Sequence, residues 1–220
     1  MNTWVVIPAY NEERHIGRTL DDVRSQPERY HVVVVDDGST DRTYDSARAK
    51  ARVLRHRLNR GMGAALVTGT RYALRQGAEC VVHFDADGQH HASEIRRVID
   101  KIEAGSYDVV LGSRYLEQHQ IPFTKKYFIH WPARIFQNVM TGVRLTDVHN
   151  GFRAMSRSAA EKIRIEQDRM AHNSEIVAQL RVHHLRFCEV PVTITYSEYG
   201  QKLSDGVKII RDLIIKKLLK

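Results

Sequence analysis

ECVVHFDADGQHH, residues 79–91, is the stretch of sequence from which the fold is best inferred. Its apolar part, Cys80–Phe84, is short and continuous and ends in a turn at Gly88, which is typical of a parallel strand buried on both faces. In open α/β sheets, ligands bind beyond the carboxyl ends of the strands. The stretch therefore predicts a ligand site at Asp85 and the residues that follow it.

The polar residues of this stretch suit a divalent cation. Asp85, Asp87 and Gln89 offer two carboxylates and an amide oxygen, the hard ligands that Mg²⁺ and Mn²⁺ accept when nucleotide phosphates complete the coordination. Alternatively, the aspartates could form only a polar strand-to-helix turn and cap the next helix. The stretch alone leaves both interpretations open. His90 and His91 are adjacent, so their side chains point different ways, which favours solvent exposure or a supporting role over direct metal binding.

The composition is that of a globular protein with excess positive charge. The 220 residues include 34 Lys and Arg against 26 Asp and Glu, which gives a net charge of +8 and a pI of about 9.6. This excess indicates an anionic partner, such as nucleic acid, nucleotide phosphates or an anionic membrane surface. Cys80 and Cys188 lie far apart in apolar runs, which indicates buried free thiols in a reducing compartment.

We expect a cytoplasmic protein that forms a single domain. The first residues lack the basic and apolar regions of a secretory signal. No apolar stretch approaches the roughly 20 residues needed to span a bilayer. The length is sufficient for one domain with a sizeable core and does not require two.

Strand-like and helical patterns alternate through the first half of the chain. The strand-like runs are Trp4–Ile7, His31–Val35, Arg52–Arg55, Cys80–Phe84 and Asp108–Leu111, and Pro8 is expected to end the first. Helical spacing follows at Ile16–Val23, in a segment ending near Arg75, and at Ala92–Glu103. This alternation predicts an α/β fold with a doubly wound, mostly parallel sheet and helices on both faces.

Two other turns could take part in binding. Asp36–Asp41 (DDGSTD) follows the second strand, where Gly38 permits a sharp turn and the residues after it can cap a helix. Asn59–Ala65 is a glycine-bearing loop that opens a helix, and such loops can direct backbone N–H groups toward an anion. Its G-x-G spacing matches neither the Rossmann nor the P-loop fingerprint.

The character of the chain changes after Arg114. Residues Tyr115–Arg144 are rich in aromatic and basic side chains, and a predicted helix, Thr124–Thr141, could carry them. Its aromatic residues could form either core or a lipid contact. Beyond it we expect a helix, a strand and a basic terminal helix, at Asn173–Val182, Phe187–Tyr196 and Gly206–Lys220. Pro191 interrupts the strand, which indicates either the edge of a sheet or the start of strand pairing.

Five motifs, in order along the chain, resemble those of the family-2 glycosyltransferases of GT-A fold. They are Pro8–Glu12 (PAYNE), Asp36–Asp41 (DDGSTD), Asp85–Gln89 (DADGQ), Gly112–Arg114 (GSR) and Asn150–Arg153 (NGFR). Within that family, the chain looks like the dolichyl-phosphate mannose synthases and the bacterial polyprenyl-phosphate glycosyltransferases. The motifs extend over nearly the whole chain.

The resemblance implies roles in donor binding. The residues that would line the nucleotide pocket are Pro8, Ala9, Tyr10, Asn11 and Glu12. Asp37, supported by Asp36, would read the edge of the base, and Asp85 with Ala86 would face the ribose or the donor sugar. Asp87 would hold Mg²⁺ or Mn²⁺ on the diphosphate, together with Gln89.

The resemblance also implies phosphate contacts. Arg114 would bind phosphate, for which its bidentate fork is suited. The segment Gly200–Ser204 resembles a Gly-Gln-Ser-Lys-Leu loop of the family but lacks the serine, and its Lys202 would close on phosphate. The divalent cation, Arg114 and Lys202 would together neutralise the leaving diphosphate.

The expected reaction moves a sugar from a UDP-, GDP- or dTDP-linked donor, with inversion at the anomeric carbon. A polyprenyl phosphate acceptor is already anionic and needs no base; Arg153 and the basic helix around Lys125 and Lys126 could hold it. A hydroxyl of a growing glycan would need a general base, for which Asp147 and Glu175 are the candidates.

We expect one GT-A domain over residues 1–204, with a nucleotide-sugar half at 1–114 and an acceptor half at 115–204. The basic helix at 205–220 could pack on the domain, lie on the inner face of the membrane as in a peripheral protein, or meet a small membrane protein. Two other classes remain as alternatives. A glycine-rich, lysine-bearing loop directly after the first strand would favour a nucleotidyltransferase, and the sequence has none there. A nucleic-acid-binding module is disfavoured because, without a metal, the strand-end carboxylates would repel a phosphate backbone. We therefore expect no nucleic-acid partner.

Overall fold

The computed structural model describes residues 1–116, 142–148, 150–168 and 172–195. Within these residues, one seven-stranded sheet has the order β3-β2-β1-β4-β6-β5-β7. The strands are β1 (Thr3–Ala9), β2 (His31–Asp36), β3 (Arg52–Arg55), β4 (Cys80–His83), β5 (Val109–Ser113), β6 (Arg153–Ser156) and β7 (Phe187–Pro191). Only β6 runs antiparallel to its neighbours, β4 and β5. The predicted mostly parallel sheet is confirmed.

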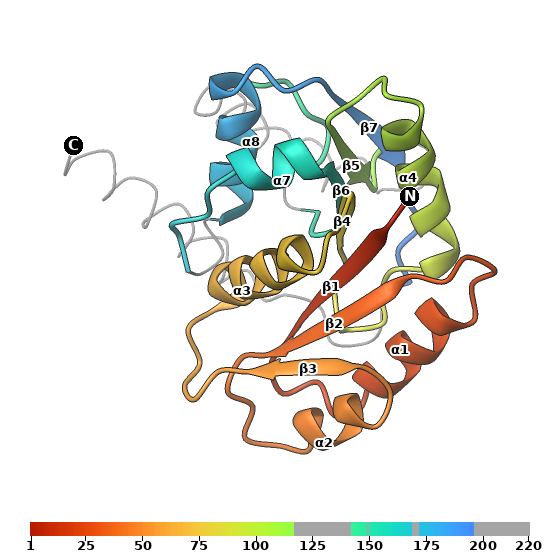
Figure 1. The fold of residues 1–220 in the computed structure, drawn as a ribbon, viewed down its shortest axis with the longest axis vertical. Helices are drawn as coiled ribbons and strands as arrows, with labels where there is room; N and C mark the ends of the chain where they lie inside the picture. Colours follow the sequence, from red (N-terminus) through yellow and green to blue (C-terminus); the bar gives the residue numbers. More distant parts are fainter. Residues whose placement is uncertain (117–141, 149, 169–171, 196–220) are drawn as a thin grey trace, which may run out of the picture.

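Helices cover both faces of this sheet (Figure 1). They are α1 (Ile16–Arg24), α2 (Thr43–Arg48), α3 (Met62–Arg75), α4 (Ile95–Glu103) with a preceding 3₁₀ turn (Ala92–Glu94), α7 (Arg157–Lys162) and α8 (His172–Val182). Successive side chains of a strand point to opposite faces. Val5 and Ile7 of β1 therefore join a core with α1, α2 and α4, whereas Trp4 and Val6 join one with α3, α7 and α8. The sheet is doubly wound, as predicted.

The first strand is longer than the sequence predicts, because Pro8 lies inside it. β1 continues to Ala9 and pairs with β2 over its last residues, with Pro8 opposite Val35. Proline lacks the N–H that a second neighbour would need. The β4 register extends only to Val6 of β1, so at Pro8 the strand has β2 alone as partner. The expectation that Pro8 ends the strand is wrong.

The strand β6 and the helix α7 are not predicted by the sequence. The sequence of Asp147–Arg153 predicts a turn or strand end, whereas Arg153 begins a strand between β4 and β5. The four residues of β6 include a buried arginine and a serine, so they form no apolar run to detect. At the other end of the sheet, β7 ends at Pro191 and, within the described residues, pairs with β5 alone, as expected of an edge strand.

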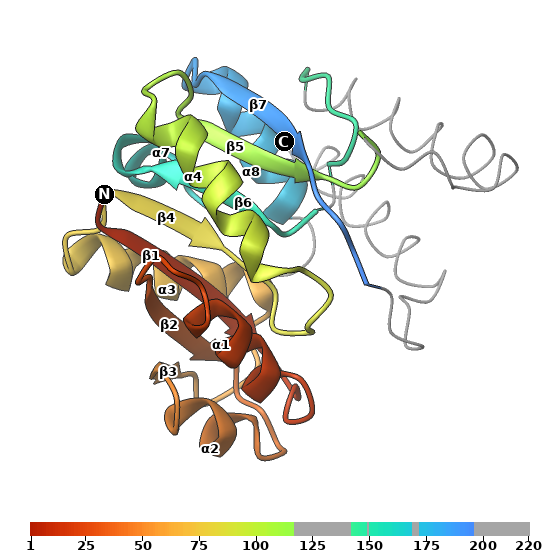
Figure 2. The same ribbon diagram turned by 90° about the vertical axis from the view of Figure 1, so that its right-hand side faces the viewer.

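The carboxyl ends of β1, β4 and β5 lie along one edge of the sheet (Figure 2). The turns after these strands carry the predicted donor-binding motifs, so the fold gathers them at a common edge. Among the residues that the structure describes, no helix is both long enough and apolar enough to cross a lipid bilayer. The predicted helices Thr124–Thr141 and Gly206–Lys220, and Lys202, lie outside the described residues.

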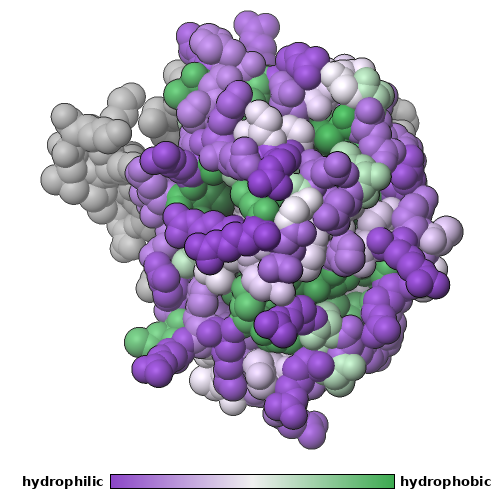
Figure 3. Space-filling view, in the orientation of Figure 1, coloured by the Kyte–Doolittle hydropathy of each residue, from purple (hydrophilic) through white to green (hydrophobic). Residues whose placement is uncertain are grey.

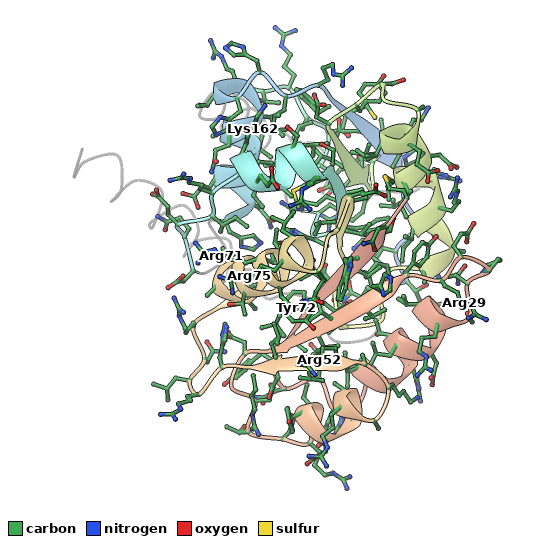
Figure 4. All side chains as sticks on the ribbon, viewed as in Figure 1. Arg29, Arg52, Arg71, Tyr72, Arg75 and Lys162 are labelled. Atoms are coloured by element: carbon green, nitrogen blue, oxygen red, sulfur yellow. The ribbon has the colours of Figure 1, made fainter. Side chains whose placement is uncertain are left out.

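Part of the positive charge lies away from this edge. The face of the molecule seen in Figure 1 is mainly hydrophilic, with smaller apolar areas between charged side chains (Figure 3). Arg71 and Arg75 of α3 and Arg52 of β3 are exposed on this face (Figure 4), and the Arg52 guanidinium lies 6.0 Å from the centre of the Tyr72 ring. Arg52 begins β3 and Arg75 ends α3, so both lie toward the amino edge of the sheet.

Candidate active site

The turn after β4 has a fixed shape. Phe84 makes the last link to β1, donating its N–H to the Val6 carbonyl at 3.0 Å. Asp87 Oδ1 then accepts the N–H of Gln89 at 2.9 Å, and Gly88 adopts a φ of 71°, which favours glycine. Thr19 of α1 donates its hydroxyl to the Ala86 carbonyl at 3.0 Å. Asp85 and Asp87 are thus presented from a turn that both β1 and α1 support.

Three carboxylates influence one another at this edge. Burial raises the pKa of Asp85 and nearby Glu12 raises it further, although Arg153 and Arg114 oppose the shift. Burial also raises the pKa of Asp87, and the charge of Asp85 adds to the effect. The pKa of Glu12 is raised by burial and by Asp87, against the hydrogen bond from His15. The PAYNE and DADGQ motifs therefore converge.

This arrangement fits a divalent cation bound with phosphate. Partly desolvated carboxylates that repel one another gain from a cation between them. Across the described ranges, no cluster of three or more His, Cys, Asp or Glu side chains forms a complete protein-only metal site. Mg²⁺ is ordinarily held by one or two carboxylates together with substrate phosphates and water. Asp85, Asp87 and Gln89 remain the predicted metal ligands.

The NGFR motif packs directly against Asp85. A Cβ added at Gly151 would lie 2.4 and 2.6 Å from the two carboxylate oxygens of Asp85. Asn150 Oδ1 accepts the N–H of Phe152 at 2.9 Å and so stabilises the turn that places Gly151 there. Only glycine leaves room for the Asp85 side chain in its present position.

Arg153 lies behind this contact and is fully buried. Its guanidinium donates to the carbonyls of Asn150 at 2.9 Å and Gly151 at 3.2 Å, and to the side chain of Asn173. Burial lowers the pKa of Arg153 to about 10, while Asp85 and Asp147 oppose the shift, so it remains charged at neutral pH. The sequence analysis expected Arg153 to hold an acceptor phosphate, but its guanidinium is engaged by the protein itself.

Arg114 and Asp147 form a bidentate ion pair. Arg114 Nε and Nη2 donate to the two carboxylate oxygens of Asp147 at 2.7 and 2.8 Å, and the Arg114 backbone N–H adds a third bond at 3.1 Å. The second candidate base, Glu175, accepts the backbone N–H groups of Glu166 and Gln167 at 2.8 and 2.9 Å. Both candidate bases therefore hold protein groups in place.

The DDGSTD motif is bound to its own surroundings. Asp36 is fully buried, accepts the N–H of Ser39 at 3.0 Å and pairs with Arg55 at 2.9 Å. The carboxylate of Asp37 accepts bonds from three groups of the loop before α3. They are Arg60 N at 3.0 Å, Gly61 N at 2.6 Å and His56 Nδ1 at 2.7 Å. Asp37, expected to read the base edge, is thus occupied in holding this loop.

The glycine-bearing loop Asn59–Ala65 was expected to direct backbone N–H groups toward an anion, but these groups bind other parts of the protein. The N–H groups of Arg60 and Gly61 bind the carboxylate of Asp37, and those of Gly63 and Ala64 reach the Asp168 carbonyl at 2.8 and 3.4 Å. These donors are used inside the protein, so the loop does not offer them to an external anion. A different pocket, of about 320 Å³, opens beside the loop and is lined by Gly38, Ser39, Arg55, His56 and Arg57. The sequence analysis singled out neither His56 nor the two arginines.

The PAYNE motif is joined to the DDGSTD motif. Asn11 has a positive φ of 56° and binds Ser39 Oγ through its N–H at 3.0 Å, while its Oδ1 accepts the N–H of Thr40 at 2.9 Å. Glu12 donates its N–H to Thr43 Oγ1 at 2.7 Å. Pro8 and Ala9 end β1, and Tyr10 is exposed. The first motif therefore forms a rigid rim next to the pocket.

The two adjacent histidines take different environments. His90 is buried between Phe84 and Phe152, with Nε2 3.7 Å from Asp85 Oδ2, and burial lowers its pKa to about 4. His91 is exposed and bonds Thr195 Oγ1 at 2.9 Å. Of the two expected environments, solvent exposure applies to His91, whereas His90 is buried and packs beside Asp85.

Comparison with known proteins adds independent information. The sequence pattern described as "Glycosyl transferase family 2" matches residues 4–164. The UDP-N-acetylglucosamine–dolichyl-phosphate N-acetylglucosaminyltransferase of Methanococcus voltae is 32% identical, over 98% of this chain and 96% of the relative. The undecaprenyl-phosphate mannosyltransferase of Micrococcus luteus is 30% identical, over 94% of this chain and 89% of the relative.

Among solved structures, the chain resembles glucosyl-3-phosphoglycerate synthase from Mycobacterium tuberculosis in complex with Mn²⁺, UDP and phosphoglyceric acid. The TM-score is 0.75, with 97% of this chain and 76% of that chain covered and 19% sequence identity. At this identity the likeness concerns the fold alone. It confirms the GT-A fold expected from the sequence.

Proposed function

The chain belongs to glycosyl transferase family 2, and on this basis we propose that it moves a sugar from a nucleotide-sugar donor to a polyprenyl phosphate. The names of the Methanococcus voltae and Micrococcus luteus relatives support this acceptor, since both include a polyprenyl-type phosphate. These names point to different sugars, so they leave the donor of this chain open.

The observation that carries the donor half of the proposal is the pair of carboxylates at the end of β4. Burial raises the pKa of both Asp85 and Asp87, so ionising them costs free energy in the apo-protein, and a bound cation would relieve that cost. Asp87 and Gln89 would hold Mg²⁺ or Mn²⁺, with Asp85 toward the ribose, the sugar or the metal. The cation would stabilise the negative charge of the leaving diphosphate.

The state of the two candidate bases supports a phosphate acceptor. A sugar hydroxyl must lose a proton as it attacks, whereas a phosphate oxygen is already anionic near neutral pH. Both carboxylate oxygens of Asp147 accept hydrogen bonds from Arg114, and Glu175 accepts two backbone N–H groups. Neither carboxylate is set up to take a proton. Transfer to a glycan hydroxyl, with one of them as base, is the second candidate and would need that carboxylate to be released first.

The remaining roles follow from position. Arg114 follows the end of β5 and would bind phosphate through the Nη1 side of its guanidinium, because Nε and Nη2 bind Asp147. Lys202, outside the described residues, would add a second cation. An acceptor oxygen aligned opposite the leaving diphosphate would invert the anomeric centre. Because the acceptor would be membrane-borne, we place the working enzyme peripherally at a membrane surface, where its net charge of +8 would favour anionic lipids.

The first test is thermal stability with UDP-, GDP- and dTDP-sugars, each with and without Mg²⁺ or Mn²⁺. A ligand at about 100 times its Kd stabilises the folded state by about 2.7 kcal/mol, which raises the Tm of a chain of this size by roughly 5 to 11 °C. We expect one base to give a metal-dependent shift that Asp87→Ala abolishes and Asp45→Ala, an exposed control on α2, retains. The stabilising sugar should then be transferred to undecaprenyl or dolichyl phosphate, with release of the nucleoside diphosphate. Absence of any nucleotide-dependent shift would refute the donor site.

A further inference from the structure

We propose that Glu189 of β7 is a positioning residue that orients Arg114 through Thr146 and Asp147, an inference that rests on the proposed function. In the register of β7 with β5, Glu189 lies opposite Leu111, and Leu111 is two residues before Ser113. The sequence motifs do not include it. Its carboxylate is nevertheless the centre of a hydrogen-bond network that ends at the phosphate-binding arginine.

The first link joins Glu189 to the segment between Gly142 and Asn150. Both oxygens of Glu189 accept the N–H of Thr146 at 2.9 Å, and Oε1 also accepts the N–H of Asp147 at 3.1 Å. The hydroxyl of Thr146 adds a bond to Oε1 at 2.8 Å. A single carboxylate thereby fixes two consecutive backbone N–H groups and one side chain.

The direction of the hydroxyl bonds follows from this arrangement. An ionised carboxylate only accepts, so the Thr146 hydroxyl donates its one proton to Glu189. Thr146 Oγ1 must then accept from Ser113 Oγ, which lies 2.6 Å away, and Ser113 Oγ in turn accepts the N–H of Tyr115 at 3.2 Å. The residues on both sides of Arg114 are thus held by a chain of bonds that ends at Glu189.

The second link joins Asp147 to Arg114. With its backbone held by Glu189, Asp147 meets the Arg114 fork through both carboxylate oxygens, at 2.7 and 2.8 Å. Arginine has many rotamers, and a guanidinium fixed by Asp147 before the substrate arrives loses less freedom when its other edge binds phosphate. Glu189 touches no reacting atom in this scheme. Its contribution is to keep Asp147, and through it Arg114, in one orientation.

A double-mutant cycle on kcat/KM for sugar transfer tests this relay. Coupled residues of one network typically change each other's effects by roughly 2- to 150-fold. We expect Glu189→Ala to lower kcat/KM by about 10-fold or more, and the double variant Glu189→Ala/Arg114→Ala to be within about twofold of Arg114→Ala alone. Glu189→Gln, which keeps acceptor oxygen and shape, should retain more activity. Glu161→Ala, which removes an exposed carboxylate of α7, is the matched control and should be neutral.

Losses that simply multiply in the double variant would overturn the proposal, because a residue that only stabilises the fold has no reason to act through Arg114.

A second measurement does not depend on sugar transfer. The Arg114 Nε–H, assigned by its absence in Arg114→Lys, should give a shifted, hydrogen-bonded ¹⁵N signal that Glu189→Ala displaces and Glu161→Ala preserves. An unchanged Arg114 signal in folded Glu189→Ala would show that Glu189 does not position Arg114. If the wild type transfers no sugar, the proposed function is contradicted. The Arg114 signal would still show whether Glu189 positions Arg114.

Discussion

Replacement of Gly151 by alanine should disable the site without unfolding the protein. The new Cβ would lie 2.4 Å from Asp85 Oδ2, whereas ordinary contacts begin near 3.4 Å, so the carboxylate must retreat by about 1 Å. The φ of Gly151 lies outside the positive range, so the backbone itself accepts alanine. The buried Arg153 and His90 surround Asp85 and limit where it can go. The disturbance should therefore concentrate on the Asp85 carboxylate.

The size of the effect follows from that displacement. A misplacement of about 1 Å at a reacting centre can cost roughly 100-fold in rate, equal to about 2.7 kcal/mol. We expect kcat/KM for sugar transfer to fall by that factor, while overpacking lowers stability by only about 1–3 kcal/mol. The metal-dependent Tm shift with the nucleotide sugar should shrink in parallel.

The matched control is Gly17→Ala in α1, where the nearest atom to the added Cβ is Lys50 Nζ at 3.9 Å. Alanine is favoured over glycine in a helix by about 1 kcal/mol, so this variant should be as active as wild type and slightly more stable. If Gly151→Ala is folded and transfers sugar at the wild-type rate, then the close fit around Asp85 has no functional role. The donor-site geometry described above would then be mistaken.

Three further predictions concern the same edge of the sheet. Asp87→Asn should raise the Tm of the apo-protein at neutral pH, because it removes a half-buried carboxyl group whose pKa is raised, and it should abolish the metal-dependent shift. A lower Tm would contradict this. Raised pKa values at Asp85 and Asp87 mean that ionisation costs folding stability, a cost absent below the ordinary carboxyl pKa of about 4 and complete above the raised values. Metal affinity, followed by titration calorimetry, should accordingly weaken as the pH falls through that window, and a flat profile would exclude these ligands. His56→Ala should destabilise the protein by about 1–3 kcal/mol and weaken nucleotide binding, because His56 bridges Asp37 and Thr68 at 2.7 and 2.9 Å. Tm and calorimetry measure the two effects. Unchanged nucleotide binding would show that the pocket beside His56 is not part of the donor site.

The features that the sequence predicted well are those with a local cause. Cys80–Phe84 and Val32–Val35 are mainly apolar runs; the first is buried throughout and the second from Val33 onward, because both faces of the sheet are covered. Position at a strand end was enough to place Asp85 and Asp87 at the carboxyl edge of the sheet. Pro191 marked the sheet edge because proline cannot donate to a further neighbour.

The features that the sequence did not predict depend on distant partners. β6 is a strand because β4 and β5 flank it, since its own residues carry no apolar pattern. Asp37 could equally have faced a nucleobase, and only the fold shows that its carboxylate accepts the N–H groups of Arg60 and Gly61. Glu189 acts on Thr146, a residue 43 positions away, so no local pattern could identify it.

The place of β6 in the strand order has a consequence for how the chain can be divided. β4 and β5 are consecutive in sequence, yet β6 separates them in space. Residues 1–114 alone would therefore contain the four paired strands β3-β2-β1-β4 and a separate β5, with the edges of β4 and β5 that face β6 left unpaired. Residues 1–114 are therefore not an independent folding unit. During synthesis, β5 cannot join the sheet until Arg153–Ser156 has left the ribosome, and a chain cut anywhere between β5 and β6 should expose two edges prone to aggregation.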